Sequence, residues 1–239
     1  ATLNYPNYVF CDSHGGSLYF SDAGNNKVRT VSLNSGIISL LVGSGSVTTT
    51  DTAGMATATP LDGPLGVWGD LNGNMYIGEE SGNKIKYVAS TTNIMTTIAG
   101  RGTADTSATL SLGDGGDATA ASLYNPWMVF VKPNGNVLIA DYNHYKIRMM
   151  YDDSPTSQPT SRPSMQPTQQ PASQHSLIMT TVAGTGVTTP ATADGSVALS
   201  TNIFYPGGLW VDTSDNVYYT DIAGYLVRKI ATESTIVST

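Results

Sequence analysis

The sequence predicts an all-β protein built from four copies of one structural unit. Four segments of the 239-residue chain align when four prolines are superposed: Pro6, Pro64, Pro126 and Pro206. Each unit reads as four short strands separated by turn residues, which is the pattern of an antiparallel sheet. Three units close with a Gly-x-Gly phrase, in "LLVGSG", "TIAGRG" and "TVAGTG", and the fourth ends at "TIVST". We expect one domain, 1–239, with units at about 1–46, 47–102, 103–186 and 187–239.

The first strand of each unit is expected to be buried on both faces. An aromatic residue stands four places after each proline, at Phe10, Trp68, Phe130 and Trp210, among mostly apolar neighbours. A strand that is apolar on both faces needs cover on both, which sheets arranged radially around an axis provide. The aromatic rings then fill the wedge between neighbouring sheets. Cys11 aligns with Val131 and Val211, so it is expected to be a buried core thiol.

The first hairpin and the second strand of each unit follow the same plan. The hairpin turns carry residues that accept a positive φ: Gly15-Gly16, Asn72-Gly73, Asn134-Gly135 and Asp215-Asn216. The second strand ends on an acid, and a base follows seven residues later: Asp22 and Arg29, Glu79 and Lys86, Asp141 and Arg148, Asp221 and Arg228. We interpret these pairs as structural, with the carboxylate accepting loop N–H groups and the base offsetting its charge. The alternative is a ring of catalytic carboxylates.

The segment "GDGGDATAASLYNPWMVFVKPNGNVLIADYNHYKIR", from Gly113 to Arg148, resembles the consensus blade of the NHL-repeat β-propellers. Weaker copies extend the resemblance over the rest of the chain outside 154–174. It implies a β-propeller of four four-stranded antiparallel blades, and it leaves the function open because propellers host binding, scaffolding and catalysis. Family members commonly have six blades. The four blades either close into a small ring or form an open arc, part of a larger propeller, whose exposed apolar faces demand a partner.

Composition and charge exclude two classes of partner. Charged residues make up 12% of the chain and the formal net charge is -7, so no basic stripe is available to bind phosphates or anionic lipid. No apolar run approaches the roughly 20 residues that a membrane-spanning helix needs. We therefore expect neither nucleic acid nor a membrane as a partner. The single cysteine excludes an intramolecular disulfide framework.

A proline-rich tract, "SPTSQPTSRPSMQPTQQPAS", interrupts the third unit before its last strand. We expect residues 154–174 to be a polyproline-II insertion. Such tracts resemble those of extracellular matrix and cell-surface proteins of algae and other protists, where they look like sites for O-linked glycans. The modification candidates are Pro155, Thr156, Ser157, Pro159, Thr160, Ser161, Pro163, Ser164, Pro167, Thr168, Pro171 and Ser173. The tract predicts an extracellular or cell-surface location, with a flexible tolerated loop as the alternative.

Candidate binding and metal residues are few. The loops after the second strands carry Tyr142, His144, Tyr145 and Tyr225, which could form an aromatic platform for a peptide or sugar or could simply be loop packing. The three histidines occupy unrelated places in the repeat, which argues against a zinc site. Asp114 and Asp117 of "GDGGD" are weak candidates for calcium, because further carboxylates are missing. We expect no cofactor.

The sequence thus favours a non-catalytic extracellular structural or adhesive module. Its expected partners are protein, either copies of itself or other domains of the same chain, and glycans. It would be a subunit or segment of a larger surface or filamentous assembly, with the tract glycosylated or in contact with a neighbour. Two alternatives stay open: a metal-dependent lyase or hydrolase, and a module that recognises a peptide or glycan.

Overall fold

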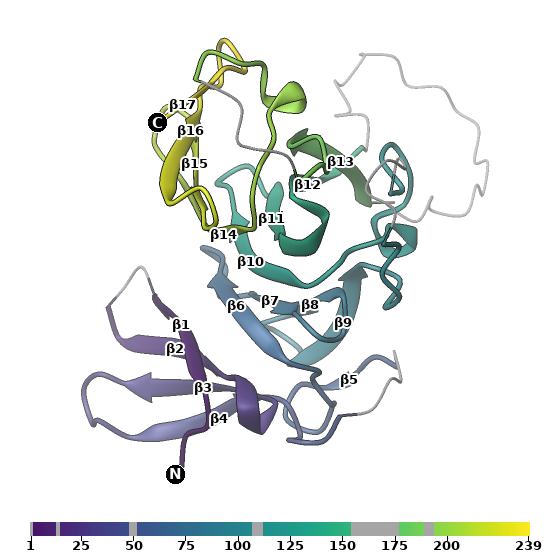
Figure 1. Ribbon diagram of the computed structural model, residues 1–239. Helices are drawn as coiled ribbons and strands as arrows, with labels where there is room; N and C mark the ends of the chain where they lie inside the picture. The colour runs from purple at the N-terminus through teal and green to yellow at the C-terminus, as the bar shows by residue number, and fades with distance from the viewer. Residues whose placement is uncertain (1, 13–14, 48–51, 107–111, 154–176, 189–193) are drawn as a thin grey trace, which may run out of the picture.

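The computed structural model describes residues 2–12, 15–47, 52–106, 112–153, 177–188 and 194–239, which form four antiparallel sheets. Strands that follow one another in the chain pair within each sheet, so the sheets are four blades of a β-propeller (Figure 1). Blade 1 holds β1 (Pro6–Cys11), β2 (Ser17–Asp22), β3 (Lys27–Ser32) and β4 (Ile38–Val42); blade 2 holds β6 (Pro64–Gly69), β7 (Met75–Glu79), β8 (Lys84–Val88) and β9 (Ile94–Ala99). Blade 3 holds β10 (Pro126–Val131), β11 (Val137–Asp141), β12 (Lys146–Asp152) and β13 (Leu177–Ala183); blade 4 holds β14 (Pro206–Val211), β15 (Val217–Asp221), β16 (Leu226–Ile230) and β17 (Val237–Ser238). The predicted all-β fold of four antiparallel blades is confirmed.

The segments that link the blades cover the outer edge of the blade they enter. The two-residue strand β5 (Gly54–Met55) pairs with β9, which gives blade 2 a fifth strand that the sequence analysis did not predict. The equivalent segments of the links into blades 3 and 4 form single β-bridges, between Asp117 and Ile178 and between Val197 and Ile236. An uncovered edge would present unpaired N–H and C=O groups to other chains. The links therefore protect the outer rim of blades 2 to 4.

Short helical turns complete the chain. The 3-10 turns η1 (Ala23–Asn25) and η3 (Tyr142–His144) follow second strands, and η2 (Ala118–Ala120) and η4 (Ala198–Ser200) lie in the links between blades. Within the described ranges, no helix is long and apolar enough to cross a bilayer.

Each hydrophobic core lies between two successive blades. Three clusters of buried apolar side chains are present among the described residues, and each combines residues from both sides of one junction. At the first junction, Val28 of β3 is packed in one cluster with Val67 of β6. The second cluster includes Ile85 of blade 2 and Val129 of blade 3, and the third joins blade 3 to blade 4. A blade therefore needs a neighbour on each side to bury its two faces.

The four blades form an open arc. In Figure 1 the sheets follow one another along a curve, with blade 1 and blade 4 at its two ends and no sheet of the described residues between those ends. The sequence analysis left two arrangements open, a small closed ring and an open arc. The described residues form the arc.

The arc corrects the predicted burial of Trp210 and Cys11. The rings of Phe10 and Trp68 lie 4.9 Å apart, and those of Trp68 and Phe130 lie 4.3 Å apart, because each points toward the following blade. No blade follows blade 4 in the structure, so Trp210 is 55% exposed. Cys11 is exposed as well, because it lies on the free side of blade 1. Both predictions were wrong for the same reason, since they assumed a neighbour on every side.

The proline-rich insertion, 154–174, lies outside the described residues, as do all the modification candidates within it. The strands on either side of it, β12 and β13, pair with each other up to Asp152 and Leu177. The chain therefore leaves blade 3 and returns to it at one place.

We expect Trp68→Ala and Trp210→Ala to differ sharply in stability. Removing the packed ring of Trp68 should lower the free energy of unfolding by about 3–5 kcal/mol. Removing the half-exposed ring of Trp210 should cost less than about 1 kcal/mol. Urea unfolding of both variants in dilute solution measures the difference. Equal losses would contradict the open arc.

Candidate functional site

An acid and a base meet at the end of the second strand in every blade. The four distances are 2.9 Å for Asp22 and Arg29, 3.6 Å for Glu79 and Lys86, 3.4 Å for Asp141 and Arg148, and 3.9 Å for Asp221 and Arg228. The four acidic side chains are almost completely buried. Buried carboxylates need both a countercharge and hydrogen-bond donors.

The same carboxylates hold the segment that enters each blade. In blade 3, the backbone N–H of Tyr124 donates to Asp141 at 2.8 Å. The equivalent N–H groups belong to Asn4, Asp62 and Phe204, and they donate to Asp22, Glu79 and Asp221 at 2.8, 2.9 and 3.2 Å. Each donor lies two residues before the proline that opens the first strand. The acid therefore ties three strands of its blade together, which is the structural role that the sequence analysis assigned to it.

The surroundings of these acids shift their titration in different directions. Burial raises the pKa of Glu79 above its ordinary value, and its polar contacts offset this rise only in part. Burial acts in the same direction on Asp22, but hydrogen bonds from Asn25, from the N–H of Asn4 and from Arg29 together lower the pKa of Asp22. Folding therefore favours the charged form of Asp22.

The "GDGGD" loop is occupied by protein donors. Arg148 donates to Asp114 at 2.7 Å and Thr181 donates to it at 2.6 Å. Asp117 accepts the backbone N–H of Thr119 at 2.8 Å and so caps η2. In the part of the chain that the structure describes, no three His, Cys, Asp or Glu side chains gather in a way that could hold a metal ion. Asp114 and Asp117 have structural roles here, and the calcium alternative stays a prediction.

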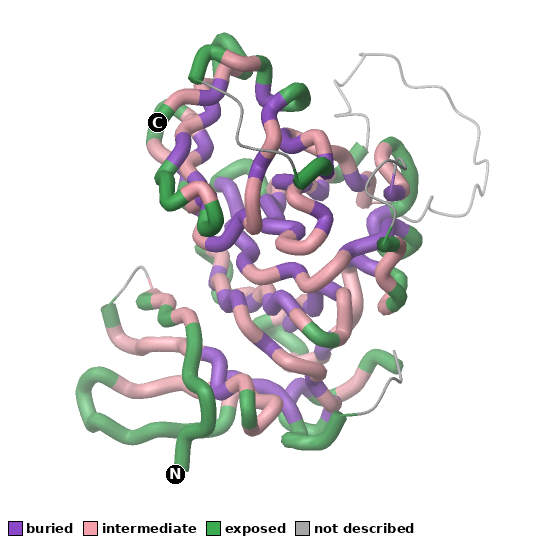
Figure 2. The backbone as a smooth tube through the Cα atoms, viewed as in Figure 1, coloured by how far each residue is buried: buried purple, intermediate pink, exposed green. Residues whose placement is uncertain are grey.

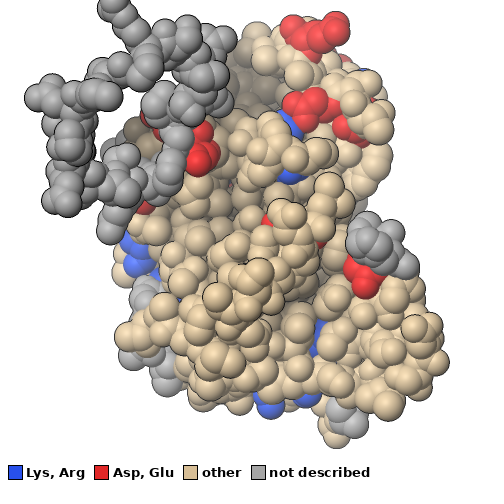
Figure 3. Space-filling model, turned by 180° about the vertical axis from the view of Figure 1, so that it is seen from behind, with Lys and Arg blue, Asp and Glu red and all other residues tan. Residues whose placement is uncertain are grey.

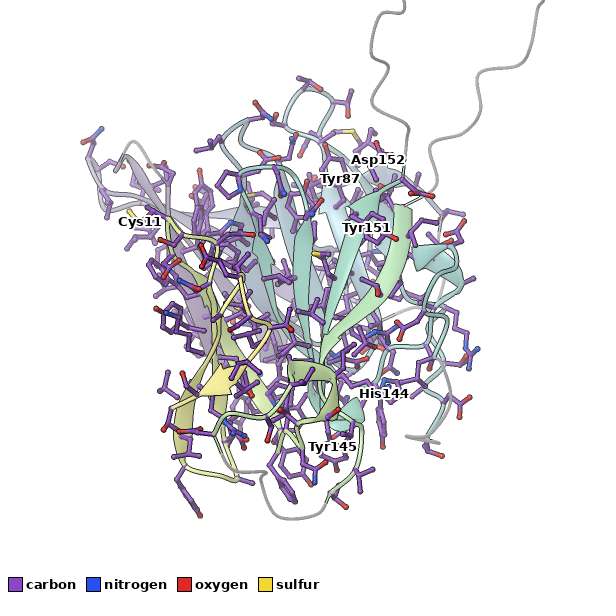
Figure 4. All side chains as sticks on the ribbon, turned by 90° about the horizontal axis from the view of Figure 1, so that it is seen from above. Cys11, Tyr87, His144, Tyr145, Tyr151 and Asp152 are labelled. Carbon is purple, nitrogen blue, oxygen red and sulfur yellow. The ribbon has the colours of Figure 1, made fainter. Side chains whose placement is uncertain are left out.

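The four predicted loop residues do not form one exposed platform. Tyr142 stacks on Trp127, with ring centroids 4.0 Å apart. His144 is buried, with Nδ1 2.8 Å from Asp141 and Nε2 2.7 Å from the carbonyl oxygen of Asp105. Figure 4 places His144 and Tyr145 together at one end of blade 3, opposite Tyr151 and Asp152.

Tyr205, which the sequence analysis missed, joins two of these residues across the junction between blades 3 and 4. Its ring lies 4.7 Å from that of Tyr142 and 5.0 Å from that of Tyr145. Burial, followed by the hydrogen bond with Tyr205, raises the pKa of Tyr145 to about 12. Tyr225, at the equivalent position of blade 4, is 93% exposed. The binding role of the four loop residues stays a prediction.

A cavity of about 900 Å³ opens where the first strands of all four blades end. The aromatic residues Phe10, Tyr19, Trp68, Phe130 and Trp210 line it, together with the first hairpin turns. Three turn aspartates on its rim, Asp12, Asp70 and Asp212, bind the backbone of their own hairpins. The cavity spans both ends of the arc, because it takes walls from β1 and from β14. It combines aromatic walls with a polar rim.

Blade 1 exposes a face that the other blades bury. We call the side of a blade that faces the preceding blade its leading face, and the opposite side its trailing face. On the leading faces of blades 2 to 4, Val67, Val129 and Leu209 are buried. Val9 is their equivalent in blade 1, and it is 68% exposed.

The rest of this leading face is apolar too. Register places Leu18, Phe20, Val31, Ile38 and Leu40 on the same side of the sheet, with Arg29 among them. Ile38 and Leu40 are exposed, and the other three are partly exposed. Figure 2 shows blade 1 mainly in the colours of exposed and intermediate residues, whereas blades 2 and 3 are largely buried.

The trailing face of blade 4 is the second free face. Trp210 is paired with Tyr218 on it, and Val227 of β16 is 62% exposed. Lys229 lies over the ring of Tyr218 at 5.8 Å. We call the leading face of blade 1 and the trailing face of blade 4 the end faces. Each corresponds to one side of the blade–blade junction that occurs three times inside the chain.

Comparison with known proteins supports the repeat type. No family model matches the chain. Over 140 residues the chain is 30% identical to NHL repeat-containing protein 2 of Bos taurus and 31% identical to that of Homo sapiens. The match takes in 56% of this chain and 18% of each relative, so it spans less than a fifth of the curated relatives.

Solved structures share the fold. An auxiliary nutrient binding protein from Bacteroides thetaiotaomicron matches 100% of this chain and 47% of its own, with 15% identity and a TM-score of 0.62. The match to a gluconolactonase from Xanthomonas campestris covers 100% of this chain and 62% of the gluconolactonase chain, with 11% identity and a TM-score of 0.59. The match to a chain of a nidogen/laminin complex covers 99% of this chain and 63% of that one, with 13% identity and a TM-score of 0.58. The chain is therefore a four-blade β-propeller whose repeats are similar to NHL repeats.

The variant Asp22→Asn tests the role of the strand-end carboxylate. The lowered pKa means that the stabilising contribution of Asp22 is complete above its ordinary value of 3.8 and is lost as the pH falls through the folded value. The variant should therefore lose about 1–3 kcal/mol of stability near neutral pH. The loss should shrink as the pH falls well below 3.8. Urea unfolding across this pH range measures it, and a loss that is independent of pH would refute the electrostatic role.

Proposed function

We propose that the chain is a non-catalytic extracellular propeller segment that joins other protein through its two end faces. The observation that supports this most directly is the leading face of blade 1, whose apolar positions are exposed although their equivalents in blades 2 to 4 are buried. The partner is protein, in the form of further copies or of other domains of the same chain. The role is structural or adhesive.

The physical case rests on the cost of leaving such a face in water. Burying apolar surface contributes about 25 cal/mol per Å², and a large continuous apolar patch on a folded protein marks an interaction site. The surface as a whole suits close packing, because only 12% of the residues are charged. Figure 3 shows acidic and basic side chains scattered over a largely uncharged face. Few charges would need to be desolvated by a partner.

The proline-rich tract supports the extracellular part of the proposal. Its hydroxyl and proline side chains resemble acceptors of O-linked glycans in surface proteins. The chain leaves for the tract after Asp152, at the end of blade 3 opposite His144 and Tyr145 (Figure 4).

A second candidate function is recognition of a sugar in the central cavity. Aromatic rings bind sugar faces, and the cavity has five of them beside a polar rim. Catalysis is a weaker alternative, suggested by the likeness in fold to a gluconolactonase, since fold alone does not carry activity.

Cys11 is the only cysteine of the chain and lies on the leading face, where it also lines the cavity. With no sugar added, its reactivity reports whether that face is covered. In the dilute isolated chain, its thiol should react with a maleimide about as fast as it does after unfolding. In native material, a partner on the face should slow the reaction at least about tenfold, as burial excludes the reagent. Equal rates in both preparations would refute the proposal. Peptides from 154–174 of the same native material should carry sugar mass increments, and unmodified peptides would refute the glycan part.

Sugar binding can be measured separately on the dilute chain. Titration with methyl glycosides of common hexoses and pentoses should change the tryptophan fluorescence, because Trp68 and Trp210 line the cavity. Trp210→Ala should weaken such binding at least about fivefold, since stacking on one ring is worth roughly 1 kcal/mol or more. No fluorescence change with any glycoside, or a change that Trp210→Ala leaves intact, would argue against this candidate.

A further inference from the structure

We propose that the partner on the end faces is a second copy of this chain, docked head to tail, with blade 1 of one copy on blade 4 of the other. This inference rests on the proposed function and deepens it, because it names what covers the two faces. It is argued from the three junctions inside the chain, which show what each kind of face binds.

The internal junctions use one recurring contact. In this contact, the residue just before the opening proline of one blade binds or packs against a loop residue of the preceding blade. That loop residue lies between the second and third strands; in blades 1 and 3 it directly follows η1 and η3. At the first junction the N–H of Gly63 donates to Asn26 at 3.1 Å. At the second, the N–H of Asn125 donates to Asn83 at 2.8 Å. At the third junction the contact is between tyrosines, because Tyr205 lies against Tyr145.

The residues equivalent to the two partners of this contact are Tyr5 in blade 1 and Tyr225 in blade 4. Tyr5 precedes Pro6, has a φ of 49° as Tyr205 has one of 54°, and is 78% exposed. Tyr225 has a φ of 55°, close to the 57° of Tyr145. Hydrogen bonds within their own blades hold this backbone, from the N–H of Ala23 to the carbonyl oxygen of Tyr5 and from the N–H of Tyr225 to that of Ile222. Both tyrosines therefore have the backbone conformation of their equivalents at the third junction.

A second copy would complete that junction with the chemistry already present between blades 3 and 4. There, the ring of Tyr205 contacts those of Tyr142 and Tyr145. On blade 4, the equivalents of those two residues are Ile222 and Tyr225, and both are exposed. Tyr5 of the second copy would enter between them.

An apolar side chain three places before each proline supplies a second recurring contact. Leu61, Leu123 and Ile203 are fully buried. Each shares a cluster with an apolar residue of the third strand in the preceding blade: Val28, Ile85 and Ile147. Leu3 is the equivalent in blade 1 and is exposed, and Val227 is the equivalent receiving residue in blade 4 and is exposed. Docking would place Leu3 on Val227.

The charged pair on the leading face is compatible with this docking. Arg29 on the leading face is paired with Asp22. Its equivalents in blades 3 and 4, Arg148 and Arg228, are buried in internal junctions. A paired arginine at this position is therefore tolerated inside a junction.

The docking joins different faces of the two copies, so it is heterologous. Two copies supply eight blades, which is within the range of about four to eight that propellers use, and a rotation of the right size closes them into a ring. Any other rotation gives an open filament. Both products follow from the same junction.

Two variants with complementary defects test the junction. The head variant is Leu3→Asp with Tyr5→Asp, and the tail variant is Tyr225→Asp with Val227→Asp. All four side chains are exposed, so each variant should fold, which circular dichroism checks. Leu199→Asp, at an exposed position of η4, is the matched control. Sedimentation velocity over a concentration series measures association of the full chain.

Wild type and control should associate as the concentration rises, as a ring or as a filament. Each double variant alone should bind itself at least about tenfold more weakly. An equimolar mixture of the two should form a dimer of one copy of each, because the intact tail of one meets the intact head of the other. A wild type that stays monomeric, variants that associate like the wild type, or a mixture that forms no mixed dimer would overturn the inference.

The outcome is separable from that of the proposed function. A monomeric wild type together with a protected Cys11 in native material would mean that another protein or domain covers the faces, so only the second-copy inference would fail. A reactive Cys11 in native material would remove the proposed function as well.

Discussion

The rest of the structure depends on the buried carboxylate at the end of the second strand. In each blade it accepts the N–H of the segment that enters the blade and lies beside a base of the third strand. These contacts fix where the first strand begins relative to the next two. Because a buried carboxylate without its partners is costly, the arrangement is specified strongly in every repeat. The same contacts fix the place of the residue before the opening proline. That residue contacts the preceding blade.

A propeller built in this way shares its cores between blades. Each cluster of buried apolar residues draws on two blades, so four blades complete three junctions and leave two half-junctions. Val9 and Trp210 are exposed for this reason, and neither has an unusual sequence context. At these two half-junctions the described residues expose positions whose equivalents at the internal junctions are buried. We propose that each end face binds protein, because the equivalent faces are covered at the internal junctions.

The local part of this design could be predicted from the sequence. The four units, their strands and the acid–base pairs follow from spacing within one repeat, and all are present. Burial could not be predicted in the same way, because it depends on neighbouring blades. Cys11 and Trp210 align with core residues, yet each needs a blade that the structure lacks. Tyr145 contacts Tyr205, far away in the sequence; the only signal for this contact was that Tyr205 stands before an aligned proline.

The most direct test of the central claim is electron cryomicroscopy of the native assembly, with attention to the leading face of blade 1. The account predicts a β-sheet packed on the side of β1 that carries Val9, continuing the arc beyond the four blades. A leading face open to solvent in the native assembly, with the four blades standing alone, would contradict it.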